Sequence, residues 1–358
     1  MNILTYLDTI LDTRQETKVI YDLSFVILFS IMAICSEAST FRRISTYFRA
    51  HFIDFKEKFN LTWERTPAYT TIRDILNSIE IEVLENAFRS FSMSQLEQEI
   101  GLIIHVDGKV LRGSKFKDQP ALQVLNAFVS NKNIIIGHKF IEENKTNEIP
   151  KAQEIIKELT ISDALFTFDA LHTQRKTMEV ITQTKNNSIL QIKGNQKSLL
   201  KACINRSKVA RCKNKDLLKE ISHGRAEIRE ISVYKGFCSY NKKIKKDWNK
   251  IKEIVKVKRT IDSKIEISYY ISTYTKIASE YQYLISDHWK VENTDHYVRD
   301  VALREDKSKI HIGAKVFAIL RSFAFNVLNL IRQKNQCITD LIYFNSQNPS
   351  FLLNSLIH

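Results

Sequence analysis

The chain has 358 residues, a length that suggests two or three domains with buried cores. Hydrophobic residues make up 44% and charged residues 26% of the sequence, which excludes wholesale disorder and a multi-span membrane protein. The 54 Lys and Arg residues outnumber the 40 Asp and Glu residues and give a net charge of +14. Such a basic chain is expected to bind a polyanion, and nucleic acid is the first candidate.

The cysteines and the start of the chain favour a reduced, cytoplasmic setting. Five cysteines are unevenly spaced and form no C-x-x-C pair. Residues 1–8 lack the basic and apolar segments of a secretory signal. The apolar stretch Leu23–Cys35 has 13 residues, fewer than the roughly 20 that a spanning helix needs, so we expect a buried helix and no membrane partner.

The first 95 residues are expected to form helices only. Apolar residues recur at helical spacing in four segments, which are 23–35, 41–59, 71–79 and 81–91. Arginines on these helices either follow a DNA backbone or serve solubility alone; they are Arg42, Arg43, Arg49 and Arg73.

From residue 101 the hydrophobic period changes to that of strands. The predicted strands are 102–106, 121–129, 134–140, 164–168 and 188–192, and the predicted helices are 149–159 and 173–185. The first three strands can pair as hairpins, whereas each later strand follows a helix and needs a parallel crossover. The sequence therefore predicts an α/β fold with a mixed sheet flanked by helices, in the element order of the ribonuclease H-like fold.

The rest of the chain divides into an insertion and a helical end. Residues 196–280 are basic and β-rich and interrupt the α/β pattern. Segments 288–300 and 314–333 are predicted helices, and the second has a wide apolar face that would dock on the sheet. The expected division is a helical region at 1–95, a ribonuclease H-like core at 96–195, an insertion at 196–280, and helices completing the core at 281–358.

Three acidic residues are candidates for metal binding. Asp107 directly follows the predicted strand 102–106, and Asp169 ends the strand 164–168 in the same way. If these strands are neighbours, both carboxylates meet at one edge of the sheet, and Glu292 from the helix after the insertion is a third ligand. Carboxylates from different elements can hold two magnesium ions, although a single Asp at a strand end is more often a turn former or helix cap.

Six motifs, in order along nearly the whole chain, resemble those of the H-repeat-associated insertion-sequence transposases, which are of the DDE class. They are DGKVLRGS at 107–114, KTNEI at 145–149, DALHTQ at 169–174, KGNQ at 193–196, HGR at 223–225 and HWKVEN at 288–293. The resemblance implies a ribonuclease H-like catalytic domain in which Asp107, Asp169 and Glu292 are the catalytic, metal-binding triad. It also implies two Mg²⁺ ions, with Mn²⁺ as a substitute, and a homodimer on DNA in the bacterial cytoplasm at the nucleoid.

Residues near the triad are candidates for supporting roles. Arg299 lies two helical turns after Glu292 and either holds a phosphate near the metals or is solvated. His288, Glu292 and His296 fall on one helix face, which also suits zinc, but the H-E-x-x-H string is absent, so the histidines are expected to pack beside the acid or contact DNA. Trp289 is expected to be a core anchor.

Basic residues give the candidate DNA surface. Segment 235–259 holds ten Lys or Arg residues against two acidic ones, interleaved with aromatic residues, and suits a phosphate backbone, with a solvated loop as the alternative. The strongest candidates there are Lys242, Lys243, Lys245 and Lys246. Lys109, Arg112, Lys193 and Asn195 flank the acids and could position the scissile strand, although Lys193 and Asn195 also suit a purely structural strand end. No P-loop or Rossmann motif is present, so no nucleotide cofactor is expected.

The function expected from the sequence is a DNA transposase that cuts element ends and transfers the strands to target DNA. Ser286 and Tyr297 stand where the family commonly has Arg and Trp, departures that bear on DNA binding near the site. Two alternatives remain open at this stage. One is a transposase-derived DNA-binding protein without catalysis, and the other is a ribonuclease H-like, magnesium-dependent nuclease.

Overall fold

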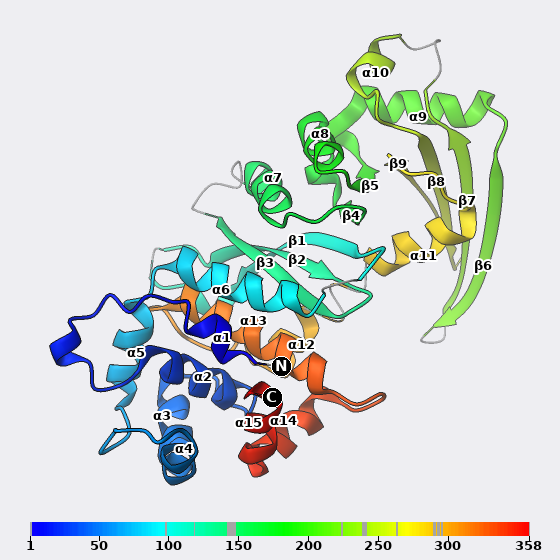
Figure 1. The fold of residues 1–358 in the computed structure, drawn as a ribbon. Coiled ribbons are helices and arrows are strands. Elements are labelled where there is room, and N and C mark those ends of the chain that lie inside the picture. Colours follow the sequence, from blue (N-terminus) through cyan, green and yellow to red (C-terminus); the bar gives the residue numbers. More distant parts are fainter. Residues whose placement is uncertain are drawn as a thin grey trace.

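The computed structural model describes residues 2–96, 99–117, 119–141, 148–222, 225–237, 242–262, 264–288, 291, 294 and 296–357. A nine-stranded sheet runs through the molecule, with helices on both faces (Figure 1). The order of the strands across it is β3-β2-β1-β4-β5-β9-β8-β7-β6.

The amino-terminal region is helical, as predicted. Its helices are α1 (Leu4–Leu7), α2 (Leu23–Ile34), α3 (Phe41–Ala50), α4 (Phe52–Phe59), α5 (Tyr69–Asn77) and α6 (Ile81–Ser94). The expected helix 41–59 is divided into α3 and α4 at His51, whose backbone leaves the helical region. Helix α2 is buried along most of its length, which confirms that the apolar stretch is a core helix.

Five strands form the mixed sheet that the sequence predicted. They are β1 (Ile103–Leu111), β2 (Leu122–Val129), β3 (Ile134–Ile141), β4 (Leu165–Phe168) and β5 (Asn187–Ile192). The pairs β1–β2 and β2–β3 are antiparallel, whereas β1–β4 and β4–β5 are parallel. Helices α7 (Glu148–Glu158) and α8 (Arg175–Gln183) make the crossovers. This is the strand order of the ribonuclease H-like fold.

The insertion extends the same sheet. After α9 (Lys197–Val209) come β6 (Asn214–Ser222), β7 (Arg225–Lys235), α10 (Lys242–Asp247), β8 (Glu253–Ile261) and β9 (Lys264–Ser272). Strand β9 pairs antiparallel with β5, and β8, β7 and β6 follow as antiparallel neighbours. The β-rich segment is therefore hydrogen-bonded, strand by strand, to the edge of the first five strands.

The remaining helices are α11 (Ala278–His288), α12 (Tyr297–Val301), α13 (Ala314–Ile331), α14 (Ile338–Gln347) and α15 (Pro349–Ile357). Among the described residues only α13 is long and apolar enough to cross a membrane, and 72% of it is buried inside the protein. It contacts α2, α6 and β3, which confirms that its apolar face docks on the sheet. Helices α13–α15 share one core with the amino-terminal helices, and the backbone N–H of Ile3 donates to Leu356 O at 2.9 Å.

Side-chain alternation along the strands assigns the helices to the two faces of the sheet. Even-numbered residues such as Ile104 and Val106 of β1 pack in one cluster with apolar residues of α7, α8 and α9. Phe128 of β2 packs on the other face with α6 and α13, and Leu165 of β4 packs there with α11. Successive side chains of a strand point to opposite faces, so His105, Asp107 and Lys109 lie on the face of α11–α13.

Candidate active site

Asp107 and Asp169 are brought together by the parallel pair β1–β4. Ile103–Val106 of β1 pair with Leu165–Phe168 of β4 in register, so Asp107 and Asp169 are the next residues on the two strands. Neighbouring strands lie about 4.8 Å apart, which places the two residues side by side where β4 ends. Two acids far apart in the sequence therefore share one edge of the sheet.

The expected position of Asp107 at the end of its strand is wrong. Strand β1 continues to Leu111, because β2 goes on pairing with it up to Leu122 after β4 has ended. The backbone of Asp107 therefore pairs with β2 on one side, whereas on the other side β4 has already ended. Asp169 does follow the last residue of its strand.

The environments of the two carboxyls differ. Burial raises the pKa of Asp107 above its usual value, and the nearby charge of Asp169 raises it further. The charges of His296 and His288 lower this pKa, but not enough to cancel the effect of burial. The imidazole of His288 is the main cause that holds the pKa of Asp169 below its usual value, and Lys193 and His172 contribute. Adjacent carboxylates of this kind repel one another unless a cation lies between them.

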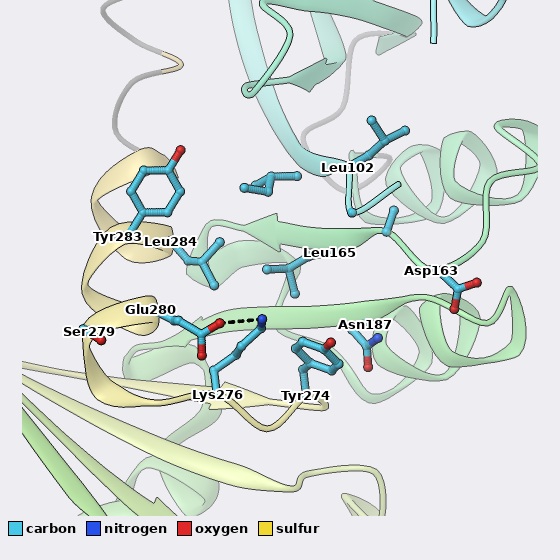
Figure 2. A pocket seen from close by; sticks show the side chains of 13 residues that line it. Leu102, Asp163, Leu165, Asn187, Tyr274, Lys276, Ser279, Glu280, Tyr283 and Leu284 are labelled. Carbon is cyan, nitrogen blue, oxygen red and sulfur yellow. Dashed lines mark hydrogen bonds and ion pairs between the residues drawn. The ribbon is translucent and has the colours of Figure 1, made fainter. Parts of the chain in front are cut away.

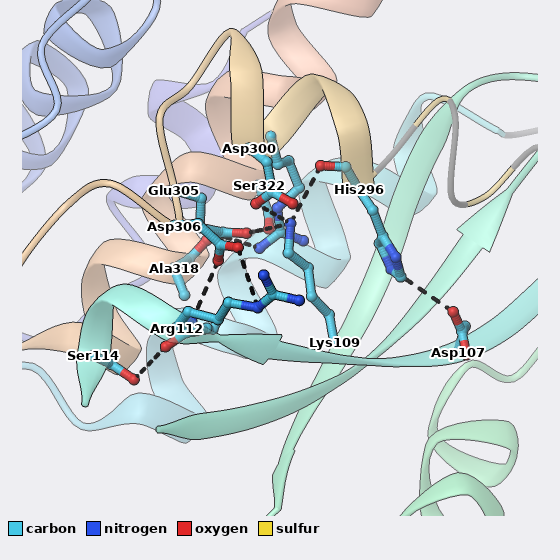
Figure 3. A network of polar contacts seen from close by, with 12 residues as sticks. Asp107, Lys109, Arg112, Ser114, His296, Asp300, Glu305, Asp306, Ala318 and Ser322 are labelled. Carbon is cyan, nitrogen blue, oxygen red and sulfur yellow. Dashed lines mark hydrogen bonds and ion pairs between the residues drawn. The ribbon is translucent and has the colours of Figure 1, made fainter. Parts of the chain in front are cut away.

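Two histidines approach the acids from α11 and α12. His288 is the last residue of α11, and its Nε2 is 3.8 Å from Asp169 Oδ1. His296 directly precedes α12, and its Nε2 is 3.8 Å from Asp107 Oδ2 (Figure 3). The predicted helix 288–300 overlaps the last residue of α11 and the residues of α12 up to Asp300, and most of the residues between them lie outside the described ranges. Glu292 and Trp289 lie outside the described residues.

The described residues include two of the three acids that were predicted to bind metal. No group of three or more His, Cys, Asp or Glu residues that could hold a metal is found within the ranges given above. Asp107 and Asp169 offer carboxylate oxygens, the donors that Mg²⁺ prefers, and their mutual repulsion fits a bound cation. These two acids therefore fit a divalent ion that takes its further ligands from other groups.

Lys109 and Arg299 are not available to DNA, and their predicted role there is wrong. Lys109 Nζ donates to Asp300 Oδ1 at 2.6 Å and lies 3.0 Å from Glu305 Oε2, with only 6% of its side chain exposed (Figure 3). Arg299 is fully buried, and its Nη2 donates to Glu305 Oε1 at 2.7 Å, so it is not solvated either. Arg321 completes this buried ionic cluster, because its charge acts on Glu305.

The buried ionic cluster joins the strand of Asp107 to α12. Lys109 is two residues beyond Asp107 on the same face of β1, and its Nζ also donates to His296 O at 3.3 Å. A buried cation is stable only when paired, and Asp300 and Glu305 provide the pairing. The cluster thereby keeps His296 next to Asp107.

Other predicted DNA contacts remain exposed. Arg112 has 82% of its side chain exposed and lies 3.8 Å from Asp306. Lys193 and Asn195 follow β5, and Asn195 Nδ2 donates to Ala170 O at 2.6 Å, next to Asp169. Asn195 therefore also has the structural role considered from the sequence, since it fixes the turn that follows Asp169.

The basic segment places its lysines on α10. Lys243, Lys245 and Lys246 are exposed, and only the backbone of Lys242 is described. Asp247 at the end of α10 accepts a hydrogen bond from Arg175 Nη1 at 2.9 Å, which ties α10 to the start of α8. Ile244 of α10 packs in the cluster of α7–α9, so α10 lies on the face of the sheet opposite to that of Asp107.

Two features near the acids were missed by sequence reasoning. His105 and Asp287 are buried side chains joined by a hydrogen bond, and the signal for His105 was a polar residue within an apolar strand, which requires a partner. Arg229 of the insertion hydrogen-bonds Ser286, so a guanidinium reaches the position where the family commonly has Arg. No sequence signal links Arg229 to that position.

A cavity of about 460 Å³ lies at the opposite end of the parallel strands (Figure 2). It is lined by Leu102 and Leu165 at the amino ends of β1 and β4, and by the ion pair of Lys276 and Glu280, whose Nζ–Oε1 distance is 2.7 Å. The candidate acids are at the carboxyl end of β4, so this cavity is not part of their site.

Comparisons with known proteins agree with the motifs. Residues 4–92 match the family described as DDE_Tnp_1-associated. The chain is 28% identical to "Putative transposase YncI" of Escherichia coli O157:H7 over 91% of this chain and 87% of that one. It is 27% identical to "H repeat-associated putative transposase YhhI" of Escherichia coli strain K12 over 91% of this chain and 90% of that one.

Among solved structures, the chain is similar to a piggyBac transposase in a synaptic complex with hairpin DNA. The TM-score is 0.42 and the identity 11%, over 98% of this chain and 78% of that one. The resemblance predicted from the six motifs is confirmed by the sequence relatives: the chain carries a DDE_Tnp_1-associated region and is a homologue of the H repeat-associated putative transposases.

Proposed function

We propose that the protein is a DDE-class DNA transposase that cleaves DNA at the ends of a mobile element and joins the ends to target DNA. The observation that carries this proposal is the pairing of Asp107 and Asp169 at adjacent positions of β1 and β4. Each of them faces a histidine 3.8 Å away, and the two histidines flank Glu292 in the chain.

The sequence supports Glu292 as the third acid. It is four residues from His288 and four from His296. Both of these histidines lie next to the paired acids.

Asp107, Asp169 and Glu292 would hold two divalent ions through carboxylate oxygens, with Mg²⁺ preferred and Mn²⁺ as a substitute. Such ions activate a water oxygen and stabilise the leaving oxygen in phosphodiester chemistry. Hydrolysis at the element end leaves a 3′-hydroxyl, which then attacks a phosphorus of target DNA and displaces the 3′-oxygen there.

Exposed cations support DNA as the substrate, and one of them is near Asp169. Lys193 is exposed and close enough for its charge to lower the pKa of Asp169. Together with Arg112 and the lysines of α10, it offers contacts for a phosphate backbone. Two ends must be processed by two sites, so we also propose a homodimer on DNA, with the helical region 1–95 as a further DNA contact.

The experiment is a cleavage and joining assay with duplex DNA from the two regions that flank the gene, where the proposal requires terminal inverted repeats. We expect Mg²⁺-dependent nicking and joining that Asp107→Asn, Asp169→Asn and Glu292→Gln each abolish. Asp163→Asn is the matched control, because this exposed carboxyl precedes the opposite end of β4 and its backbone has φ = 60°, which Asn tolerates. It should retain full activity.

Three results would redirect the proposal. DNA binding without nicking in the unaltered protein would indicate a DNA-binding protein derived from a transposase. Nicking combined with failure to join a pre-cut end that has a free 3′-hydroxyl would indicate a nuclease. Activity that survives all three acid substitutions would refute the triad.

A further inference from the structure

A chain of hydrogen bonds runs behind the candidate acids, from the start of the β2–β3 turn to His288. Ser130 Oγ donates to Asp287 Oδ2, which lies 3.1 Å from His105 Nε2. His105 Nδ1 is hydrogen-bonded to Thr167 Oγ1, and Thr167 Oγ1 is 2.8 Å from His288 Nδ1. The far nitrogen of His288 is the one that faces Asp169.

The members of this chain are enclosed by the protein. His105 is 0% exposed, Asp287 1% and Thr167 4%. They come from β1, α11 and β4, so they are fixed by three elements of the sheet and its covering helix. A buried polar side chain costs free energy unless its hydrogen bonds are made, so such a chain holds its members in one arrangement.

The donor and acceptor of each hydrogen bond in this chain can be assigned by starting from the carboxylate of Asp287. The Asp287 carboxylate can only accept, so His105 Nε2 donates to it. The Thr167 hydroxyl has one proton and lies between two ring nitrogens, so it can donate to His105 Nδ1 and still accept from a second N–H. The Thr167 oxygen then accepts from His288 Nδ1–H.

We propose that Ser130, Asp287, His105 and Thr167 form a positioning network that fixes His288 with its proton on Nδ1 and thereby presents Nε2 as a ligand to a divalent cation held by Asp169. The distance between His288 Nε2 and Asp169 Oδ1, 3.8 Å, exceeds that of a direct hydrogen bond, about 3.2 Å at most, and leaves room for an ion. A second polar group that sets the tautomer of a ligating histidine is a recurrent feature of metal sites.

The consequence is a preference among metals. An imidazole nitrogen next to a carboxylate suits Mn²⁺ better than Mg²⁺, which favours oxygen ligands alone. This inference rests on the proposed function, since it assumes that Asp169 binds a cation. Beyond that function, the inference states that the site binds the ion through a nitrogen ligand, and that residues without contact to the ion determine the affinity of the site for it.

The test compares Thr167→Val, which removes the hydroxyl, with Thr167→Ser, which keeps it. Mn²⁺ and Mg²⁺ binding to the full-length protein is measured by titration calorimetry, without DNA. Loss of a residue that orients a metal ligand typically costs about 10–100-fold in metal affinity. We expect a loss of this size for Mn²⁺ and a smaller loss for Mg²⁺ in Thr167→Val, and recovery in Thr167→Ser.

A spectroscopic readout checks the tautomer itself. Nitrogen-15 spectra of histidine-labelled, metal-free protein should show His288 with a protonated Nδ1 and a bare Nε2, and His288→Gln identifies the signal. Thr167→Val should lose this single tautomer, and Thr167→Ser should keep it. A proton on Nε2 of His288 in the unaltered protein would overturn the inference.

The two proposals fail in distinguishable ways. If Asp169→Asn binds Mn²⁺ as tightly as the unaltered protein, the metal site of the proposed function is wrong. If Asp169→Asn loses Mn²⁺ while Thr167→Val binds it normally, the acids hold the ion and only the positioning network is wrong. Asp163→Asn again serves as the charge-matched control.

Discussion

Replacing Glu305 by Gln tests the energetic importance of the buried ionic cluster. Burial alone would raise the pKa of Glu305, but the charges of Arg299, Lys109 and Arg321 outweigh it and lower the pKa to about 2. The ordinary value is 4.5, and each pH unit of difference corresponds to about 1.4 kcal/mol. The ionised carboxylate is therefore expected to contribute about 3 kcal/mol to stability at neutral pH.

The sign of the pH dependence follows from the lowered pKa. A carboxyl that is more acidic in the folded state stabilises the protein fully above pH 4.5, and this contribution is lost as the pH falls from 4.5 toward 2. Chemical unfolding at pH 7 should show a loss of about 3 kcal/mol in Glu305→Gln. Between pH 4.5 and 2, the free energy of unfolding of the unaltered protein should fall because Glu305 becomes protonated. Glu305→Gln should lack this contribution to the fall.

Glu37→Gln is the control for this experiment. Glu37 pairs with Arg304 at 2.6 Å, but its side chain is 51% exposed, and an exposed pair contributes at most about 1 kcal/mol. Equal losses in Glu305→Gln and Glu37→Gln would refute the reasoning. The reasoning would also be refuted if the free energy of unfolding of Glu305→Gln fell between pH 4.5 and 2 as steeply as that of the unaltered protein.

Two further predictions concern a close backbone contact and the DNA surface. A Cβ at Gly113 would overlap the carbonyl oxygen of Ser308, so Gly113→Ala should destabilise the protein by about 1–3 kcal/mol in thermal unfolding, whereas Gly194→Ala meets no atom within 4 Å and should be neutral in packing. A stable Gly113→Ala would mean that the turn Arg112–Ser114 and the 305–308 segment are not in contact. If Lys245 binds a phosphate, Lys245→Gln should reduce the slope of log affinity against log salt by about 0.9, while the exposed Lys334→Gln leaves the slope unchanged.

Much of the fold could be predicted from the sequence, because its elements follow hydrophobic periodicity. The five strands of the mixed sheet and both crossover helices lie within a few residues of their expected positions, except that β1 continues to Leu111. Strand β6 was not anticipated, since charged residues interrupt its apolar ones along Asn214–Ser222 and it is the last strand of the sheet, at its edge. Edge strands are covered less by other elements, and their pattern is weaker for that reason.

The candidate site could be predicted only in part. Asp107 and Asp169 were identified by their positions relative to apolar strands, and the register of β1 and β4 brings them together. Lys109 and Arg299 were assigned to DNA because a basic residue near an acidic motif gives no indication of its own burial. Their true partner, Glu305, belongs to the irregular segment after α12, where no period predicts which side chains turn inward.

The direct pairing of β9 with β5 has a mechanical consequence. From β5, which neighbours the strand of Asp169, to β6 the sheet crosses four inter-strand spacings, about 19 Å, without a linker. If the α10 lysines bind DNA as proposed, they do so from a helix that lies between β7 and β8 in the chain, and both strands belong to the sheet that carries Asp107. Bending of the DNA would then serve to bring the cleavage point to the acids.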